Sequence, residues 1–366
     1  MTLKLLAPET CEFDVVALGE VMLRLDPGDN RIRWTRHFTV WEGGGEYNLA
    51  RGLSAVFAQR AAVLTALPET EVGHLVEGLI RASGVNAGLI HWSEYDGVGE
   101  TGRLGLNFTE RGFGVRPALG VSDRAHSAAA ALTADNFDLE DLFGRRKVRW
   151  LHTGGIFAAL SPAAADLAEQ VMTVAHRHGT VVSYDLNYRE SLWRRQGGQP
   201  AAQAVNRRLA PLADVMLGNE EDFAAALGIS AVGVGPDLDN LPVPAFKAMI
   251  EQAAAAYPNF KVVATTLRRV ISASRNDWGA IAWSNDGAFA EAPTRPALEI
   301  LDRVGGGDSF AAGLIYGLMQ GMDLAEAVKY GSAHGALAMT TPGDVSQADL
   351  AQVRHLAGGG NARVVR

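Results

Sequence analysis

Short apolar runs and amphipathic stretches alternate along most of the chain. Residues 15–18 form an apolar run that ends at Gly19, which is typical of a buried strand. Leu49, Leu53 and Val56 then recur at the spacing of one helical face. Because a strand followed by a helix is the unit of this pattern, it predicts an α/β fold.

The same pattern continues through the rest of the sequence. It predicts strands at residues 62–66, 148–152, 181–184, 215–217 and 261–265, and helices at residues 70–82, 161–178, 220–227, 246–257, 310–319 and 324–338. Strands that alternate with helices form a mostly parallel sheet with helices on both faces. Ligands of such sheets lie beyond the carboxyl ends of the strands, so we expect the chemistry in the loops that follow strands.

The composition of the 366-residue chain limits which partners and sites it can have. Hydrophobic residues make up 48% and charged residues 20%, which is enough apolar material for a sizeable core. The net charge of −8 argues against nucleic acid as a partner, because binding to a phosphate backbone needs a basic surface. Cys11 is the only cysteine, which excludes an intrachain disulfide and favours the cytoplasm. The start of the chain does not resemble a secretory signal and no apolar run is long enough to span a membrane, so we expect no membrane partner.

The most informative segment is residues 302–313, where three glycines lead directly into an apolar helical run. Glycines at a helix N-terminus present free backbone N–H groups and the positive end of the helix dipole to an anion. Asp308 begins this helix. The local pattern leaves two roles open for it: a helix cap, or a base that accepts a proton from a hydroxyl during phosphoryl transfer.

Residues 302–313 resemble the carboxyl-terminal signature of the ribokinase-like (pfkB) sugar kinases, Asp-Thr-x-Gly-Ala-Gly-Asp-x-Phe-x-x-Gly. Arg303 and Gly306 stand where that signature has Thr and Ala. Residues 43–50 are similar to the family's amino-terminal signature, Gly-Gly-Ala-x-x-Asn-x-Ala. The two signatures lie far apart and in the family's order, which makes the pair much more specific than either alone.

The resemblance implies a ribokinase-like α/β fold: three αβα layers with a mostly parallel central sheet and a small β lid. It covers residues 13–341 as one kinase domain and leaves residues 342–366 as a C-terminal extension. Residues 21–42 and 97–125, which read as short strands and turns, would form the lid. Such a lid closes over the sugar and excludes water, which favours transfer over hydrolysis of ATP.

The resemblance also implies a role for single residues. The second signature would supply the base and the anion hole, and the first signature the sugar site, where glycine lets a sugar edge approach the backbone. The residues are Asp308 as the base, Gly305, Gly306 and Gly307 as the anion hole, and Gly44, Gly45 and Asn48 as sugar-binding residues together with Asp308. The implied cofactors are ATP and Mg²⁺.

A third run indicates the acceptor. Residues 185–193 resemble the Asp-x-Asn-x-Arg-x-x-Leu-Trp run of 2-keto-3-deoxygluconate kinases, whose substrate is a sugar acid. Arg189 in this run and Arg124 in a second matching element would bind the carboxylate, because an arginine fork pairs with both carboxylate oxygens. Asn107 and Ser122 stand where those kinases have tyrosines near the substrate.

The nucleotide side follows the family less closely. Asn219 and Asp222 resemble an Asn-x-x-Glu element that is associated with the positioning of phosphate and metal. Asp222 is therefore a candidate Mg²⁺ ligand, although an acidic helix N-terminus would explain the carboxylate equally well.

Residues 265–279 lack the glycine turn that relatives place against the nucleotide, so we expect a rebuilt nucleotide loop there. Leu267 and Arg268 are its candidate nucleotide contacts, and Gly305 and Gly307 would contact the phosphates. Ser332, on the predicted helix at residues 324–338, would lie near the adenine or pack neutrally within that helix.

Alternatives to a sugar-acid kinase stay open. The same fold phosphorylates neutral sugars such as fructose and ribose, or nucleosides, and a non-catalytic relative would bind a sugar or nucleotide without turnover. In every case the partner is a small molecule. Relatives often pair through the lid, which makes a homodimer the expected assembly.

Overall fold

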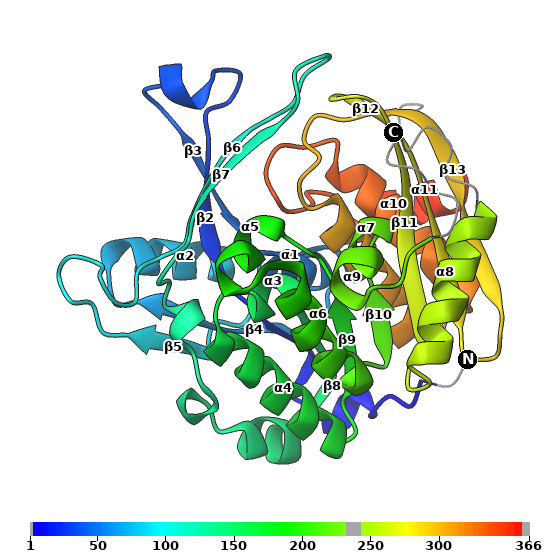
Figure 1. Ribbon diagram of the computed structural model, residues 1–366, viewed down its shortest axis with the longest axis horizontal. Coiled ribbons are helices and arrows are strands. Elements are labelled where there is room, and N and C mark those ends of the chain that lie inside the picture. The colour runs from blue at the N-terminus through cyan, green and yellow to red at the C-terminus, as the bar shows by residue number, and fades with distance from the viewer. Residues whose placement is uncertain (1–2, 232–242, 361–366) are drawn as a thin grey trace.

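A nine-stranded sheet lies between two layers of helices, and a separate four-stranded sheet projects from it (Figure 1). The computed structural model describes residues 3–231 and 243–360. The α/β class, the mostly parallel central sheet and the second, smaller sheet are confirmed. Residues 361–366 of the expected C-terminal extension lie outside the described residues.

Seven neighbouring strands of the large sheet run parallel, and two antiparallel strands are added at one edge. In spatial order the strands are β13 (Phe289–Glu299), β12 (Arg275–Ser284), β11 (Val262–Ser272), β10 (Val215–Leu217), β9 (Val181–Asp185), β8 (Val148–Gly154), β1 (Phe13–Leu18), β4 (Ala61–Pro68) and β5 (Ile90–Ser93). β1 is buried on both faces, as the uninterrupted apolar run at residues 15–18 predicts.

The segment expected to be a rebuilt nucleotide loop, residues 265–279, is instead a long β-hairpin. β11 continues through Leu267 and Arg268 to Ser272, and β12 returns antiparallel to it from Arg275. The prediction of a loop was wrong because β-branched residues along β11 favour the extended backbone, and the reversal needs only two residues.

Each face of the large sheet is covered by its own set of helices. One face carries α1 (Gly45–Arg51), α2 (Glu71–Ala82), α9 (Gly306–Met319), α10 (Leu324–Ala338) and α11 (Leu350–Ala357); the other carries α3 (Gly155–Ala158), α4 (Pro162–Arg177), α6 (Gly198–Leu209) and α8 (Val243–Ala256). Two short helices, α5 (Glu190–Trp193) and α7 (Glu220–Asp222), follow β9 and β10. No helix of the described residues is long and apolar enough to span a membrane.

Two helix starts follow directly from their sequence. The Thr70 hydroxyl accepts the Gly73 N–H at the start of α2, and the Ser161 hydroxyl accepts the Ala164 N–H at the start of α4, where Pro162 occupies the first helical position. These caps fix where each helix leaves the preceding strand.

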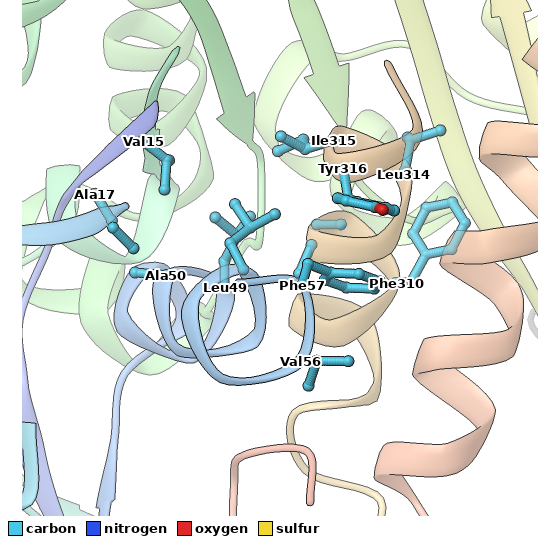
Figure 2. Packing of buried hydrophobic residues seen from close by; sticks show 14 of the residues in the cluster. Val15, Ala17, Leu49, Ala50, Val56, Phe57, Phe310, Leu314, Ile315 and Tyr316 are labelled. Carbon is cyan, nitrogen blue, oxygen red and sulfur yellow. The ribbon is translucent and has the colours of Figure 1, made fainter. Parts of the chain in front are cut away.

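The helices α1 and α9 pack against each other although they lie far apart in the sequence (Figure 2). Leu49 of α1 and Ile315 of α9 lie between the two helices, and the rings of Phe57 and Tyr316 stack with centroids 4.4 Å apart. This apolar contact brings the first turns of both helices to the carboxyl end of the sheet.

The small sheet has the strand order β3 (Thr39–Gly43), β2 (Met22–Asp26), β6 (Leu106–Glu110) and β7 (Leu119–Asp123). Figure 1 shows its long β6–β7 hairpin reaching toward the tip of the β11–β12 hairpin. The two tips are bonded: the Gly114 N–H donates to the Ser274 hydroxyl (3.1 Å) and the Ala273 N–H donates to the Gly114 carbonyl (2.9 Å). The small sheet is thus held across the carboxyl ends of the parallel strands.

Candidate active site

A cavity of about 520 Å³ lies between the small sheet and the carboxyl ends of the parallel strands. Asn107 and Ser122 face it from the small sheet, and Asp185 faces it from the end of β9. Both glycine signatures reach this cavity, so residues from opposite ends of the chain share one site. Its position agrees with the rule that ligands of parallel sheets bind beyond the strand ends.

The N-terminus of α9 forms one wall of this cavity. Gly305 precedes the helix with φ 77°, and a Cβ built there would lie 1.8 Å from the Asp344 carbonyl oxygen, so only glycine fits. The first N–H groups of a helix have no partner within the helix, and here they border the cavity. The glycine turn (residues 305–307) is therefore shaped to receive an anion.

Asp308 lies on the first turn of α9 and faces the same cavity. The Asn48 side-chain amide donates to Asp308 Oδ2 at 2.7 Å, which leaves Oδ1 on the side of Gly45. Burial raises the pKa of Asp308 to about 6, while Asn48 and the Arg189 charge oppose that rise. The carboxylate can thus accept a proton near neutral pH.

The predicted sugar-site residues are brought together around Asp308. A Cβ built on Gly45 would lie 3.6 Å from both Asp308 Oδ1 and the Asn187 amide nitrogen, so this glycine keeps the floor of the cavity open. Gly44 adopts φ 145°, and a Cβ there would lie 2.0 Å from the Glu20 carbonyl oxygen. Asn187 is a cavity residue that the sequence reasoning missed; its φ of 29° is strained for a residue other than glycine.

The two candidate carboxylate-binding arginines differ in their surroundings. Arg124 lines the cavity but is already paired with the buried Glu20, whose carboxylate accepts its Nε at 2.7 Å. Arg189 also lines the cavity, and within the described part of the chain the only hydrogen bond of its side chain goes to the carbonyl of Tyr188. Arg189 is therefore the one of the two whose guanidinium is free for a ligand.

A buried charge cluster beneath the glycine turn was not predicted. Arg24 of β2 is fully buried and donates to Asp302 (2.5 Å), Asp344 (2.6 Å) and Asp26 (3.0 Å). Burial raises the pKa of Asp344 to about 6 against the opposing charge of Arg24. Asp302 in turn accepts the N–H groups of Val304 and Gly343. The cluster ties the small sheet to the segments on both sides of the glycine turn, and Asp344 lies beyond the predicted end of the domain at residue 341.

The pfkB family carbohydrate kinase profile matches residues 12–350. The chain belongs to the pfkB family of carbohydrate kinases. A 2-dehydro-3-deoxygluconokinase structure from Thermotoga maritima is 36% identical and superposes with a TM-score of 0.85, covering 94% of this chain and 99% of that one. A PfkB family carbohydrate kinase from Listeria grayi is 27% identical, with a TM-score of 0.82 over 94% and 99% of the two chains. The 2-dehydro-3-deoxygalactonokinase of Haloferax volcanii is 27% identical over 354 residues, which are 96% of this chain and 99% of that protein.

The structure places the four expected nucleotide contacts differently in this kinase. Asn219 and Arg268 line the cavity. Leu267 does not: side chains of a strand alternate, so Thr266 and Arg268 face the cavity while Leu267 packs on the opposite face. Ser332 is also not brought to the cavity; it is fully buried in α10, and its hydroxyl accepts Arg295 Nη1 at 3.0 Å. The sequence predicted its helix but not which face it would occupy.

Asp222 lies at the cavity, but both of its carboxylate oxygens are engaged. They accept the N–H groups of Asn219 (2.9 Å) and Tyr188 (2.8 Å), so the residue closes a capping box at the start of α7. Within residues 3–231 and 243–360, Asp185 is a cavity residue whose carboxylate has no hydrogen bond or ion pair, and the carboxylate of Glu220 accepts only its own backbone N–H. In the same residues no three His, Cys, Asp or Glu side chains converge as a metal site. In proteins Mg²⁺ is usually held by one or two carboxylates together with phosphate oxygens and water.

Replacement of Arg24 should destabilise the kinase strongly. Arg24→Met leaves Asp302 and Asp344 buried without their cation, which should cost about 3–5 kcal/mol of unfolding free energy at pH 8 in urea titrations. Loss of Arg24 raises both carboxylate pKa values further, and the protonated acids tolerate burial, so the deficit should shrink as the pH falls from 8 toward 6 and level off below 6, where Asp344 of the wild type is protonated as well. A deficit that is equal at pH 5 and pH 8 would contradict the buried charge cluster.

Proposed function

We propose that this kinase transfers the γ-phosphoryl group of ATP to the terminal hydroxyl of a sugar acid, 2-keto-3-deoxygluconate or its galactonate isomer. The observation that carries the proposal is Asp308, a carboxylate with a pKa near 6 that stands beside free helix amides in a cavity. The names of the Thermotoga maritima and Haloferax volcanii relatives support this substrate class. Arg189, which has no carboxylate partner among the described residues, supports an acidic acceptor.

In the proposed reaction the acceptor hydroxyl lies against Oδ1 of Asp308, on the side of Gly45. Asp308 accepts the hydroxyl proton, and the oxygen attacks the γ-phosphorus while the bond to the bridging oxygen breaks. The amides of the glycine turn hold the charge of the transferring group in fixed positions. Asn48 orients the base, and the small sheet limits access of water.

We assign the donor nucleotide to the side of the cavity lined by Asn219 and Arg268, next to the glycine turn. Mg²⁺, when bound with the nucleotide, neutralises phosphate charge. Asp185 and Glu220 are the residues that would hold it, in place of Asp222.

The assembly and location of the kinase are also proposals. Leu119 and Val121 of β7 are 43% and 46% exposed at the edge of the small sheet. This apolar edge supports a homodimer that pairs through the small sheet. The single cysteine, Cys11, is free and buried, which supports the cytoplasm.

A panel of acceptors tests the function. Release of ADP should be seen with 2-keto-3-deoxygluconate or 2-keto-3-deoxygalactonate and be at least tenfold slower with fructose, ribose and nucleosides. Asp308→Asn should keep the thermal unfolding midpoint and lower kcat by about 10²–10⁴-fold, because the base is removed. Equal turnover of a neutral sugar would favour a neutral-sugar kinase, and nucleotide binding without turnover of any acceptor would favour a binding protein.

The acid limb of kcat/KM should report Asp308. We expect a midpoint near pH 6 in the wild type, because the carboxylate must be ionised to accept a proton. Asn48→Ala removes a hydrogen bond to the ionised form, so its midpoint should move to higher pH. Protonation of the nucleotide affects the wild type and Asn48→Ala equally, so it does not contribute to the difference between their midpoints. An unchanged midpoint in Asn48→Ala would show that another group limits the acid side.

Arg189→Ala should raise KM for the sugar acid by at least tenfold and leave KM for ATP within about twofold, because a two-point ion pair with the acceptor carboxylate is lost. Arg194→Ala is the matched control, since Arg194 lies one helical turn away, pairs with Glu190 and does not line the cavity. If Arg189→Ala and Arg194→Ala have the same KM for the sugar acid, Arg189 does not bind the acceptor carboxylate.

A further inference from the structure

Three arginines line the cavity without a carboxylate partner. Arg189, Arg268 and Arg303 come from the loop after β9, from β11 and from the segment before α9, and none forms an ion pair within residues 3–231 and 243–360. The other cavity arginine, Arg124, is neutralised by Glu20. A group of unpaired guanidinium ions that share one cavity is unfavourable unless an anion joins them.

Arg303 is the most constrained of the three. It is half-buried, and burial together with the charges of Arg268 and Arg189 lowers its pKa. Its neighbour Asp302 is held by the buried Arg24, and Asp302 also accepts the Val304 N–H at 3.2 Å. The backbone around Arg303 is thus fixed, and Arg303 lines the cavity two residues before the glycine turn.

The three unpaired arginines are close to one another but have different further neighbours. The charge of Arg189 acts on Asp308, Asp185 and Asp222, which places it beside the base. The charge of Arg268 acts on Glu220, next to Asn219 on the nucleotide side. Arg303 lies within the field of Arg268 and of Arg189, two residues before the glycine turn that would receive the transferring phosphoryl group.

We propose that Arg303 and Arg268 clamp the phosphate chain of the nucleotide donor and neutralise the charge that builds up on the leaving nucleoside diphosphate. The inference rests on the proposed phosphoryl transfer. When the γ-phosphorus forms its bond to the acceptor oxygen, the electron pair of the broken bond stays on the bridging oxygen of the diphosphate, and the acceptor proton passes to Asp308. Two guanidinium forks suit this site because each offers paired donors to phosphate oxygens.

The substitutions Arg303→Met and Arg268→Met test the clamp, alone and combined. Each substitution keeps an apolar side chain of similar length and removes the positive charge. Arg269→Met is the control, because Arg269 neighbours Arg268 on β11 but pairs with Asp277 and does not line the cavity. Calorimetry without acceptor measures the affinity for ATP, ADP and adenosine, and thermal unfolding shows whether each variant folds.

We expect the Arg303→Met and Arg268→Met variants to bind ATP at least tenfold more weakly and adenosine within twofold of the wild type, since adenosine has no phosphate. Turnover should fall by about 10²-fold or more, as for other arginines that contact a transferring phosphoryl group. Free guanidinium ion should partly restore the turnover of Arg303→Ala. Arg269→Met should bind and turn over like the wild type.

The proposal is overturned if ATP affinity stays within twofold in the folded double variant. It is also overturned if the affinity for adenosine falls as much as that for ATP, because the arginines would then serve the pocket of the nucleobase. If KM for the sugar acid rises while ATP binding is unchanged, the arginines serve the acceptor, and the proposal is again overturned. Failure of the proposed function gives a different result. The wild type would then phosphorylate no sugar acid, while the calorimetric comparison would still decide whether the arginines bind the phosphates.

Discussion

The site depends on the packing of α1 against α9. Leu49 of α1 and Phe57, which follows it in the chain, pack with Ile315 and Tyr316 of α9 and hold the two helices together (Figure 2). That packing sets the 2.7 Å hydrogen bond from Asn48 to Asp308. A base needs a defined orientation and an adjusted pKa, and both come from this contact: the helix interface buries the carboxylate, and the amide keeps its ionised form accessible.

Arg24 extends this constraint to the small sheet. One guanidinium joins β2 to Asp302 before the glycine turn and to Asp344 after α10. A cation and carboxylates that are removed from water together are held in one geometry, because any displacement leaves a charge without its partner. The hydrogen bonds between the tips of the β6–β7 and β11–β12 hairpins add a second connection at the far end of the cavity. The part that covers the acceptor and the part that receives the phosphates are therefore mechanically linked.

Charge is distributed unevenly around the cavity. Carboxylates gather around the end of β9, where burial and the neighbouring charges of Asp222, Asp308 and Glu46 raise the pKa of Asp185 well above its usual range. The unpaired arginines line the same cavity, and the charges of Arg189 and Arg268 act on these carboxylates and on Glu220. A polyphosphate and a sugar acid would bring negative charge to the arginines, whereas the carboxylates favour a divalent cation or a proton. The chain as a whole is acidic, so the attraction for anionic substrates is local to the cavity.

The sequence by itself determined the alternation of strands and helices, the caps at Thr70 and Ser161, and the two glycine signatures with Asp308, because these depend on local backbone preference and on residues that are neighbours in the chain. Tertiary structure decided the rest. Leu267 faces away from the cavity because strand pairing fixed which side of β11 is inward, and Ser332 is enclosed because α10 packs that face against the sheet. Arg24 is more than 270 positions away in the sequence from both Asp302 and Asp344, and yet the three side chains meet. No local pattern marks such a pairing, since only the packed fold removes these charges from water and makes them depend on one another.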